Sequence, residues 1–386
     1  MSGPGKEIFR RRSGLTLDAI NDSRPRLKIS VDAMGGDSEP AELVAGVALA
    51  AERLPHARFC LFGDEQALRR AAEAVGLAPD RFEISHAPHA VSMDDKPSDV
   101  IRRAGGTSMA AAIASVETRK SDVVVSCGNT GALMALASLR LGRIDGVARP
   151  AIAALWPSVA EGKSSIVLDV GADIRIDAHN LCQFAVMGAA CARPVLDLGR
   201  PRVGLLNIGS EAHKGNRVLH EASELIERAA SRHRFDYRGF IEANDIPMDV
   251  VDVAVTDGFT GNIALKAAEG TARLIGLRMK SAFTASPFAQ IGAALASGAF
   301  SQLKRSLDPR QVNGGVLLGL RGAVVKSHGD SDALGFASAL MLASRVGGAR
   351  LPQTIAETIG RTSAEPGEGR APNRQASPPA NRGQVG

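Results

Sequence analysis

Short apolar runs rich in valine and isoleucine recur along the chain, and most of them end in a polar turn that contains glycine. A segment with apolar residues at helical spacing then follows the turn. Residues 121–135 (SDVVVSCGNTGALMA) give the clearest example, and residues 251–267 (VDVAVTDGFTGNIALKA) repeat the same order. A short run of β-branched residues predicts a strand, whereas apolar residues three and four apart predict a helix. The pattern therefore predicts repeated strand, turn and helix units.

Repetition of this unit predicts the fold class. Strands joined by crossover helices pair in parallel, so the pattern indicates an α/β fold with a three-layer, Rossmann-like sheet of mostly parallel strands. Helices are expected at 64–75 and at about 178–191. Besides the run before Ser126, strands are expected at 27–33, 58–62, 82–85, 151–156, 165–170, 203–208, 235–241, 251–256 and 316–320.

Composition divides the chain into a folded body and two tails. Residues 1–26 are basic and residues 353–386 are rich in Pro, Gly, Ala, Asn and Arg, which predicts disordered tails on either side of a single α/β domain at 27–352. The tails carry +3 and +1 of the formal net charge of +5, so about +1 remains on the body. Because the chain also has only one Trp and one Tyr, a face that binds nucleic acid is not expected.

The cysteines and the N-terminus bear on the cellular compartment. Four cysteines without CxxC spacing predict reduced thiols and no metal cluster. Residues 1–20 lack the continuous apolar segment of a signal peptide, and no window holds the ~18 to 20 apolar residues of a transmembrane helix. These features predict a cytoplasmic protein. No GxxxxGK[ST] motif is present and no GxGxxG motif follows the first strand, so no cofactor is expected.

The polar turns all follow strands, and open α/β sheets bind ligands at the carboxyl ends of their strands. We therefore expect the turns to converge in one cleft, where helix N-termini can hold phosphate and stabilise an oxyanion. The acidic residues Asp32, Asp169 and Asp257 either cap turns or orient a lysine or a substrate hydroxyl. The candidate residues that bind substrate or phosphate are Asp32, Gly35, Gly36, Asp37, Asn129, Thr130, Gly131, Asp169, Gly171, Asn207, Gly209, Gly215, Asp257, Gly258, Thr260 and Gly261.

Three further residues of these turns are the candidate catalytic groups. We expect the turn at 129–131 and Lys214 to hold a phosphate, while Asn216 or Asn262 stabilises an oxyanion on a reacting carbonyl. If phosphate is itself the nucleophile, the enzyme needs no covalent residue. Cys127 is accordingly expected to be a small buried thiol.

Residues 93–108 form a polar connection that contains Lys96, Arg102 and Arg103. Clustered basic side chains attract acidic partners and mainly raise the rate of encounter. The connection is therefore a candidate lid or docking face for an acidic partner, and a merely solvated run of charge is the alternative.

Residues 279–312 interrupt the alternation of strands and helices and predict a protruding helical hairpin. Pro287 can begin its second helix, and Phe288, Ile291 and Leu295 follow at spacings of three and four. An exposed apolar stripe beside basic residues suits the interface of a bilayer. Packing between the subunits of a dimer is the alternative.

Several ordered motifs between about residues 27 and 344 closely resemble the bacterial phosphate acyltransferase PlsX family. They are VDAMGGD (31–37), SCGNTGALMA (126–135), RPA (149–151), LDVGA (168–172), QFAVMG (183–188), NIGSEAHKGN (207–216) and VTDGFTGNIALK (255–266). Two residues depart from the pattern of that family. Cys127 stands where a small Ala is usual, and Asp173 stands where Asn is more usual and adds negative charge near the expected phosphate site.

The resemblance implies an enzyme that transfers a fatty acyl group from acyl carrier protein to inorganic phosphate. It implies an acyl phosphate product that feeds phospholipid synthesis and is consumed at the membrane by a glycerol-3-phosphate acyltransferase. It also implies a homodimer, peripherally associated with the membrane, with a fold like those of the isocitrate and isopropylmalate dehydrogenases and the phosphotransacetylases.

Other functions stay open at this point. An acyl-CoA phosphotransacylase or a 2-hydroxyacid dehydrogenase would share the architecture, although a dehydrogenase should carry an arginine cluster and a metal-binding group of Asp residues that the motifs do not supply. A non-enzymatic, membrane-associated scaffold would leave the polar turns without a role. Release of free carrier thiol only when phosphate is present would distinguish these possibilities.

Overall fold

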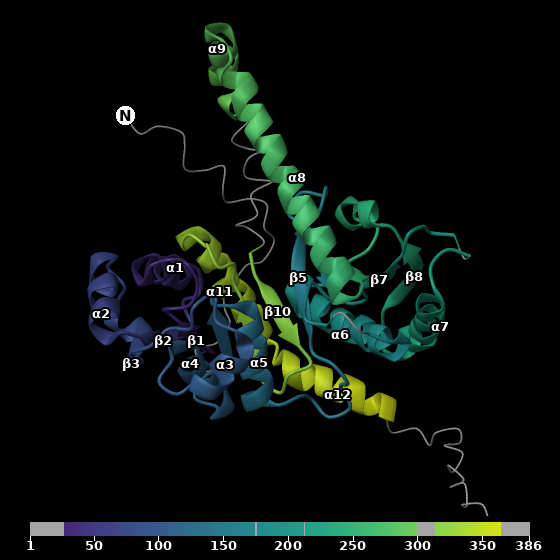
Figure 1. Ribbon diagram of the computed structural model, residues 1–386, viewed down its shortest axis with the longest axis horizontal. Helices are drawn as coiled ribbons and strands as arrows, with labels where there is room; N and C mark the ends of the chain where they lie inside the picture. The colour runs from purple at the N-terminus through teal and green to yellow at the C-terminus, as the bar shows by residue number, and fades with distance from the viewer. Residues whose placement is uncertain (1–26, 174–175, 212, 299–312, 364–386) are drawn as a thin grey trace, which may run out of the picture.

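A single sheet of eleven strands runs through the described part of the chain (Figure 1). The computed structural model describes residues 27–173, 176–211, 213–298 and 313–363. Every strand predicted from an apolar run is present. In their order across the sheet, the strands are β3 (Phe82–His86), β2 (Ala57–Gly63), β1 (Leu27–Asp32), β4 (Val123–Ser126), β11 (Ala323–Lys326), β10 (Gly315–Leu318), β5 (Ala151–Pro157), β6 (Ser164–Leu168), β9 (Val253–Val255), β7 (Arg202–Leu206) and β8 (Asp236–Ile241).

Helices cover both faces of this sheet, which confirms the three-layer α/β class. One face is covered by α1 (Pro40–Arg53), α2 (Glu65–Ala74), α6 (Ala178–Leu196), α7 (Arg217–Arg232), α11 (Ala333–Gly348) and α12 (Leu351–Ser363). The other face carries α3 (Pro97–Arg103), α4 (Ser108–Glu117), α5 (Thr130–Leu141), the short 3₁₀ helix η3 (Ala243–Met248) and the start of α8 (Gly258–Thr284). A second 3₁₀ helix, η2 (Pro79–Arg81), precedes β3.

The two apolar layers follow from the alternation of side chains along each strand. In β1, Ile29 and Val31 are fully buried in the layer that includes α1 and α11, whereas Ser30 and Asp32 point toward α4. The Ser30 hydroxyl donates to the carbonyl of Ala112 in α4 at 2.8 Å. The face of β1 that carries polar residues therefore ends, at the strand's last position, in a carboxylate.

Strand direction divides the sheet into two halves. β1, β2, β3, β4 and β11 are parallel to one another, and so are β6, β7, β8 and β9. Between them, β11 pairs with β10, β10 with β5 and β5 with β6, all antiparallel. Because strand direction reverses three times between them, the strands of one half run opposite to those of the other half. The sheet is mostly parallel, as predicted, but the carboxyl ends of its two halves lie at opposite edges.

The C-terminal boundary of the folded body differs from the prediction. Helix α12 includes residues for which the sequence predicts a disordered tail. Leu351, Ile355 and Ile359 recur every four residues and are at most 4% exposed, so this segment packs one face against the core. Of the predicted tails, residues 1–26 and 364–386 lie outside the described residues.

Helix α3 and strand β11 are among the elements absent from the sequence prediction. Helix α3 lies within the connection at 93–108, for which the sequence predicts a loop. Strand β11 is only four residues long and follows β10 after a tight turn, so its apolar run merges with that of β10. Both elements contribute to the polar edge described below.

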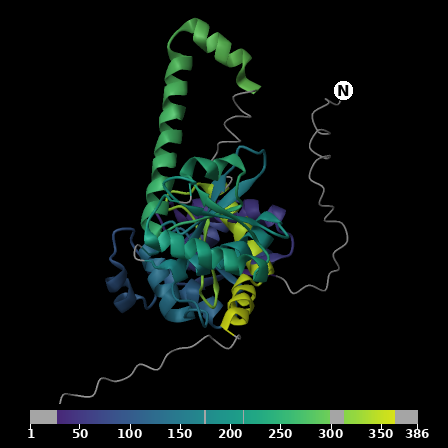
Figure 2. The same ribbon diagram turned by 90° about the vertical axis from the view of Figure 1, so that its right-hand side faces the viewer.

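Helices α8 and α9 (Pro287–Leu295) project from the body, and α9 turns back at the tip (Figure 2). The second helix begins at Pro287, as predicted, but the first begins at Gly258 and is far longer than expected. The rest of the predicted hairpin, residues 299–312, lies outside the described residues. Within the described part of the chain, none of the helices combines the length and the apolar character needed to cross a bilayer.

Candidate active site

The Asp32 carboxylate lies at the centre of a buried polar cluster at the carboxyl ends of β1, β4 and β11. It accepts hydrogen bonds from the hydroxyls of Ser108 and Ser126, both at 2.6 Å. Burial raises the pKa of Asp32, and the two hydroxyls, a backbone N–H and the charge of Lys326 act in the opposite direction. Because the hydroxyls of Ser108 and Ser126 occupy its oxygens, Asp32 joins the start of α4 to the end of β4.

Lys326 ends β11 in register with Ser126, the residue that also pairs with Asp32. Its ammonium donates to the carbonyl of Cys127 at 3.0 Å and to the carbonyl of Ser327. Burial lowers the pKa of Lys326 to about 8, although the charges of nearby groups, Asp32 among them, oppose this shift. Lys326 thus joins the turn after β4 to the turn after β11.

The turn after β4 places the N-terminus of α5 at this edge. Asn129 caps α5, because its Oδ1 accepts the N–H three residues on at 3.0 Å. Its amide group donates to the carbonyls of Met93, at 2.6 Å, and Asp95, at 3.2 Å, and so fixes the start of the basic connection. Thr130 and Gly131 follow as exposed residues at the beginning of the helix.

Glycines let the turn after β1 pack closely against its neighbours. A Cβ on Gly35 would lie 2.4 Å from an oxygen of Asp32, and one on Gly36, at φ +87°, would lie 2.7 Å from the carbonyl of Gly329. The N–H of Asp37 donates to that same carbonyl at 2.9 Å. This contact joins the turns after β1 and β11, so these glycines are needed for packing.

Cys127 lies in the same cluster and is fully buried. Burial raises the pKa of its thiol to about 11, so the thiolate that a nucleophile requires is not formed near neutral pH. Its place in the core agrees with the expectation of a small structural thiol.

A second cluster lies at the carboxyl ends of β6 and β9. Burial raises the pKa of Asp169, and backbone donors oppose the shift. A Cβ on Gly261 would lie 1.9 Å from the carbonyl of Asp169, so only glycine lets α8 start this close to the turn. Asp169 accepts at 2.9 to 3.3 Å from four backbone N–H groups, those of Ile152, Gly171, Ala172 and Asp173.

The first turn of α8 faces this cluster. Asp257 caps the helix by accepting from the N–H of Thr260 at 2.9 Å and from its hydroxyl at 2.6 Å. A Cβ on Gly258 would lie 2.7 Å from the Asp169 carboxylate. Asn262 is exposed, and its side chain lies 3.9 Å from the position a Cβ would take on Gly171. Of the candidates in this turn, only Asn262 presents an amide to solvent.

Asp173 forms an ion pair with Arg149, with 3.2 Å between the carboxylate and the guanidinium Nε. Its backbone N–H donates to Asp169 at 2.9 Å, and its carbonyl accepts from Gly258 at 2.9 Å. The Arg149 side chain is 56% exposed. The negative charge that departs from the family pattern is therefore balanced by an arginine.

Asn207 holds the loop after β7 in place. Its amide donates to the carbonyl of Lys214 at 3.1 Å, and its Oδ1 accepts from Ile208 at 2.9 Å. Gly215 has φ +92°, and a Cβ there would lie 2.6 Å from the Asn207 oxygen. Asn207 and Gly215 therefore position the backbone of Lys214.

Lys214 is half-buried, and its aliphatic stem lies over Gly209, where a Cβ would meet Cγ at 3.1 Å. Among the described residues, no ion pair engages its ammonium group, which leaves that group available to an anion. Asn216 caps α7 by accepting from Leu219 at 3.0 Å. Only the amide NH₂ of Asn216 thus remains for a ligand.

The candidate residues occupy two edges of the sheet. β4 and β7 run in opposite directions and are six strand positions apart. At about 4.8 Å per position, these strands are about 29 Å apart across the sheet. The prediction that all turns converge in one cleft at the same edge is therefore wrong. Within one chain, the turn at 129–131 and the loop of Lys214 thus follow strands that end at opposite edges of the sheet.

Helix α8 connects these two edges. It begins beside Asp169 and reaches the loop after β11, where Glu269 Oε1 lies 3.6 Å from His328 Nε2. Lys266 binds the other oxygen of Glu269 at 2.8 Å. Since Asn262, Lys266 and Glu269 recur at spacings of four and three, they share one face of α8.

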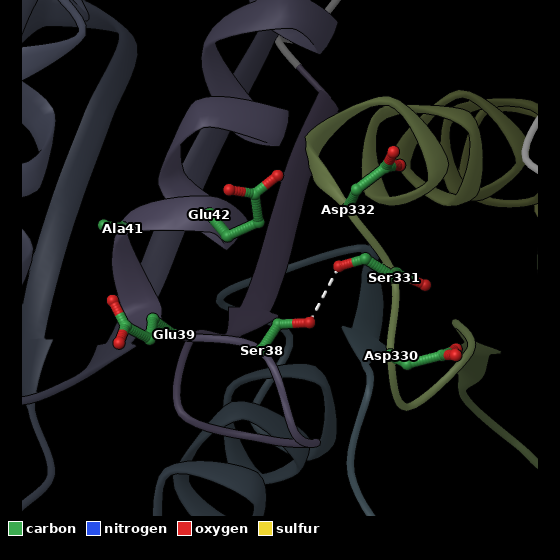
Figure 3. A pocket seen from close by; sticks show the side chains of 7 residues that line it. All are labelled: Ser38, Glu39, Ala41, Glu42, Asp330, Ser331 and Asp332. Carbon is green, nitrogen blue, oxygen red and sulfur yellow. Dashed lines mark hydrogen bonds between the residues drawn. The ribbon is translucent and has the colours of Figure 1, made fainter.

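A pocket of about 410 Å³ lies beside the same loop, between the N-termini of α1 and α11 (Figure 3). The hydroxyl of Ser38 donates to the carbonyl of Ser331 at 2.8 Å across its floor. Like charges repel strongly at short range, so a pocket lined by four carboxylates does not suit phosphate. These carboxylates belong to Glu39, Glu42, Asp330 and Asp332.

The sequence prediction omits several residues of these clusters. For Lys326 and His328 the sequence does contain a signal, because the polar run KSHGD (326–330) directly follows the apolar run of β11. Serine at the start of α4 gives no such signal, since its contact with Asp32 spans 76 residues. The omitted residues are Ser108, Ser126, Arg149, Lys326 and His328.

Comparison with known proteins shows the relationship. A family described as "Fatty acid synthesis protein" matches residues 27–354. The chain belongs to this family. A protein of Jannaschia sp. (strain CCS1) named "Phosphate acyltransferase" is 49% identical over 353 residues, which cover 91% of this chain and 95% of the relative. One of the same name from Paracoccus denitrificans is 49% identical and covers 88% and 92%. By homology the protein is an acyltransferase, related to the phosphate acyltransferases.

Solved structures support the fold alone. A EutD phosphotransacetylase from Staphylococcus aureus matches with a TM-score of 0.54 and 16% identity, over 83% of this chain and 94% of that chain. A phosphotransacetylase from Streptococcus pyogenes gives the same values. The sheet architecture is thus shared with proteins of very different sequence.

Proposed function

We propose that the protein transfers a fatty acyl group from acyl carrier protein to inorganic phosphate, and that the resulting acyl phosphate feeds phospholipid synthesis. The observation that carries this proposal is the 49% identity to a curated phosphate acyltransferase over 91% of the chain. Membership of a fatty acid synthesis family favours acyl carrier protein as the acyl donor. The reaction would take place in the cytoplasm, at the membrane surface.

In this proposal, phosphate binds at the N-terminus of α5. The first N–H groups of a helix have no partner within the helix and carry partial positive charge, which attracts anions. Thr130 and Gly131 are exposed at this position, and Asn129 keeps the helix start and the neighbouring connection fixed. A phosphate oxygen then attacks the thioester carbonyl, and the C–S bond breaks.

Lys214 would reach this phosphate only from a second subunit, because its own loop belongs to the other half of the sheet. We therefore place Lys214 and Asn216 of one protomer beside the α5 N-terminus of its partner in a homodimer. There the ammonium would bind phosphate and the Asn216 amide would donate to the oxyanion. Asn262 also belongs to this half of the sheet and would donate from the same protomer as Lys214 and Asn216.

Two surfaces would connect the reaction to its partners. The exposed Arg102 and Arg103 end α3, next to the connection fixed by Asn129, and would dock the acidic carrier protein. Phe288 and Leu295 on α9 are 86% and 85% exposed and would enter the membrane interface. Product would then leave close to a membrane-bound glycerol-3-phosphate acyltransferase.

The test is an assay of free thiol. Purified protein is incubated with acyl-ACP, with and without phosphate, and released ACP thiol and acyl phosphate are measured. We expect both products only with phosphate. A parallel reaction with acyl-CoA distinguishes a phosphotransacylase, which would prefer the CoA thioester. Thiol release without phosphate would contradict the proposed function.

A further inference from the structure

His328 lies between two carboxylates in the loop after β11. Its Nδ1 is 3.0 Å from Asp330 Oδ1, which is hydrogen-bonding distance. Its Nε2 is 3.6 Å from Glu269 Oε1, and Glu269 is held at 2.8 Å by Lys266. The side chain is 57% exposed. One ring nitrogen is therefore oriented by a close partner, while the other lies beyond hydrogen-bonding distance of Glu269.

The backbone of His328 is fixed by a buried polar network. Its N–H donates to Asn313 Oδ1 at 3.1 Å, and its carbonyl accepts from the Ser331 hydroxyl at 2.8 Å. The amide of Asn313 also donates to Ser327 at 3.0 Å and to Ser331 at 2.8 Å. An exposed ring on a rigid base is pre-organised for a task that a freely moving surface histidine would perform poorly.

The loop of His328 also adjoins the turn that leads into α5. Gly329 accepts from the N–H of Asp37, and a Cβ on Gly329 would lie 3.8 Å from the carbonyl of Cys127. Lys326 donates to that same carbonyl at 3.0 Å. The loop that carries His328 thus lies beside the turn that leads into α5, where phosphate is proposed to bind.

The chemistry of the reaction calls for a proton at this place. Hydrogen phosphate is a weaker base than an alkyl thiolate, whose thiol has a pKa of about 8.5. The less basic group leaves faster. A tetrahedral intermediate formed by phosphate would therefore return to the thioester unless its sulfur gains a proton.

We propose that His328 transfers this proton and is a catalytic residue of the acyl transfer, with Asp330 as its positioning residue. This inference rests on the proposed function. A phosphate oxygen forms the new C–O bond, the C–S bond breaks with its electron pair going to sulfur, and His328 Nε2–H protonates the sulfur. The proton of the bound hydrogen phosphate replaces the one lost from His328. Acyl thioester and hydrogen phosphate thus give acyl phosphate and free thiol.

The test uses His328→Ala in the full-length protein with acyl-ACP and phosphate. We expect kcat to fall by ~10²-fold or more, the usual contribution of a general acid or base, with little change in KM for phosphate. Added imidazole should restore turnover, whereas pyrazole, a ring of the same size that is hardly basic, should not. His56→Ala, at an exposed histidine between α1 and β2, is the control.

His328→Gln and the thermal melting of each variant separate chemistry from folding. Turnover within about threefold of the parent in both His328 variants, rescue by pyrazole as well as by imidazole, or loss without any rescue would each overturn the inference. If the parent enzyme itself releases thiol without phosphate, it is the proposed function that fails. If the parent depends on phosphate but the variants behave like it, only the role of His328 fails.

Discussion

Asp32 and Lys326 end two strands on either side of β4, in register with Ser126 between them, yet the described contacts include no ion pair that joins them. The carboxylate instead accepts from serine hydroxyls, and the ammonium donates to backbone carbonyls. Each charge is thus stabilised by neutral groups from a different turn. The consequence is that three turns are held in one arrangement by the buried Asp32 and the partly buried Lys326.

Lys326→Met should change how the free energy of unfolding depends on pH. Burial lowers the pKa of Lys326 to about 8, whereas an unfolded lysine has a pKa of about 10.4. Between these values the unfolded chain binds more protons, so the stability of the parent should rise with pH across this window. The rise is at most about 3 kcal/mol, since one pKa unit corresponds to about 1.4 kcal/mol. Urea unfolding of both proteins measures it. Curves of equal slope would contradict the assigned shift.

Lys214→Ala should lower turnover by ~10²-fold or more without changing the melting temperature, because the ammonium engages no described partner whose loss would affect folding.

Asn216 needs a matched pair of variants. Asn216→Ser keeps an oxygen to cap α7, while Asn216→Ala also loses the cap, at about 1 kcal/mol. If the amide serves catalysis, both should lose turnover but only the Ala variant should lose stability. Near-parental turnover in Lys214→Ala and Asn216→Ser would argue against the assignment.

A mixed dimer tests whether one site combines two chains. Lys214→Ala and Asn129→Ala should each be nearly inactive alone. If the groups meet across a two-fold interface, a heterodimer of the two variants has one intact site, so a random mixture should recover roughly a quarter of parental activity. Tagged, co-expressed subunits allow the heterodimer to be isolated. Should the purified heterodimer stay inactive, Lys214 does not act at the partner's α5.

The sequence predicted the ten strands with distinct apolar runs, because such runs are local features. The direction of each strand in the sheet is not local. Whether β5 runs with or against β6 depends on how strands far apart in the chain pair, and the same apolar pattern suits both arrangements. For this reason the prediction that Asn129 and Lys214 lie in one cleft was wrong. Each turn was recognised correctly, but its edge of the sheet could not be inferred from the turn.

Polar residues with partners nearby in the chain could likewise be predicted from the sequence, whereas polar residues with distant partners could not. Asn129, Asn216 and Asp257 each cap the helix that begins next in the chain, which their positions before apolar segments predict. Ser108 and Lys326 contact residues 76 or more positions away, and no local pattern identifies these partners.

Charge reversal at Arg102 and Arg103 should raise KM for acyl-ACP and weaken its dependence on salt, because electrostatic complementarity mainly sets the rate of encounter. Both lie exposed in the last turn of α3. Their reversal should leave the KM for phosphate unchanged. Reversal of Arg69 and Arg70 on α2, also exposed, is the matched control. Equal kinetics across ionic strength in the α3 variant would point to another docking face.

Phe288→Ser with Ile291→Ser should weaken binding to anionic liposomes more than about tenfold, because burial of each large apolar side chain contributes roughly 1.5 to 3 kcal/mol. The dimer and the activity in solution should survive. Gln290→Ser, an exposed polar site on the same helix, is the control. If the parent never binds liposomes and the double variant dissociates the dimer, α9 belongs to the subunit interface instead.

The place of β10 and β11 also determines how the sheet can assemble. They are the last strands in the chain, yet they lie in the middle of the sheet, between β4 and β5. Until residues 315–326 have been synthesised, the earlier strands can form only two separate sheets, each with an unpaired apolar edge. Unpaired edges invite association with other chains. The nascent protein therefore passes through a stage at which its two halves are most prone to aggregate, and that stage ends only when the C-terminal segment joins them.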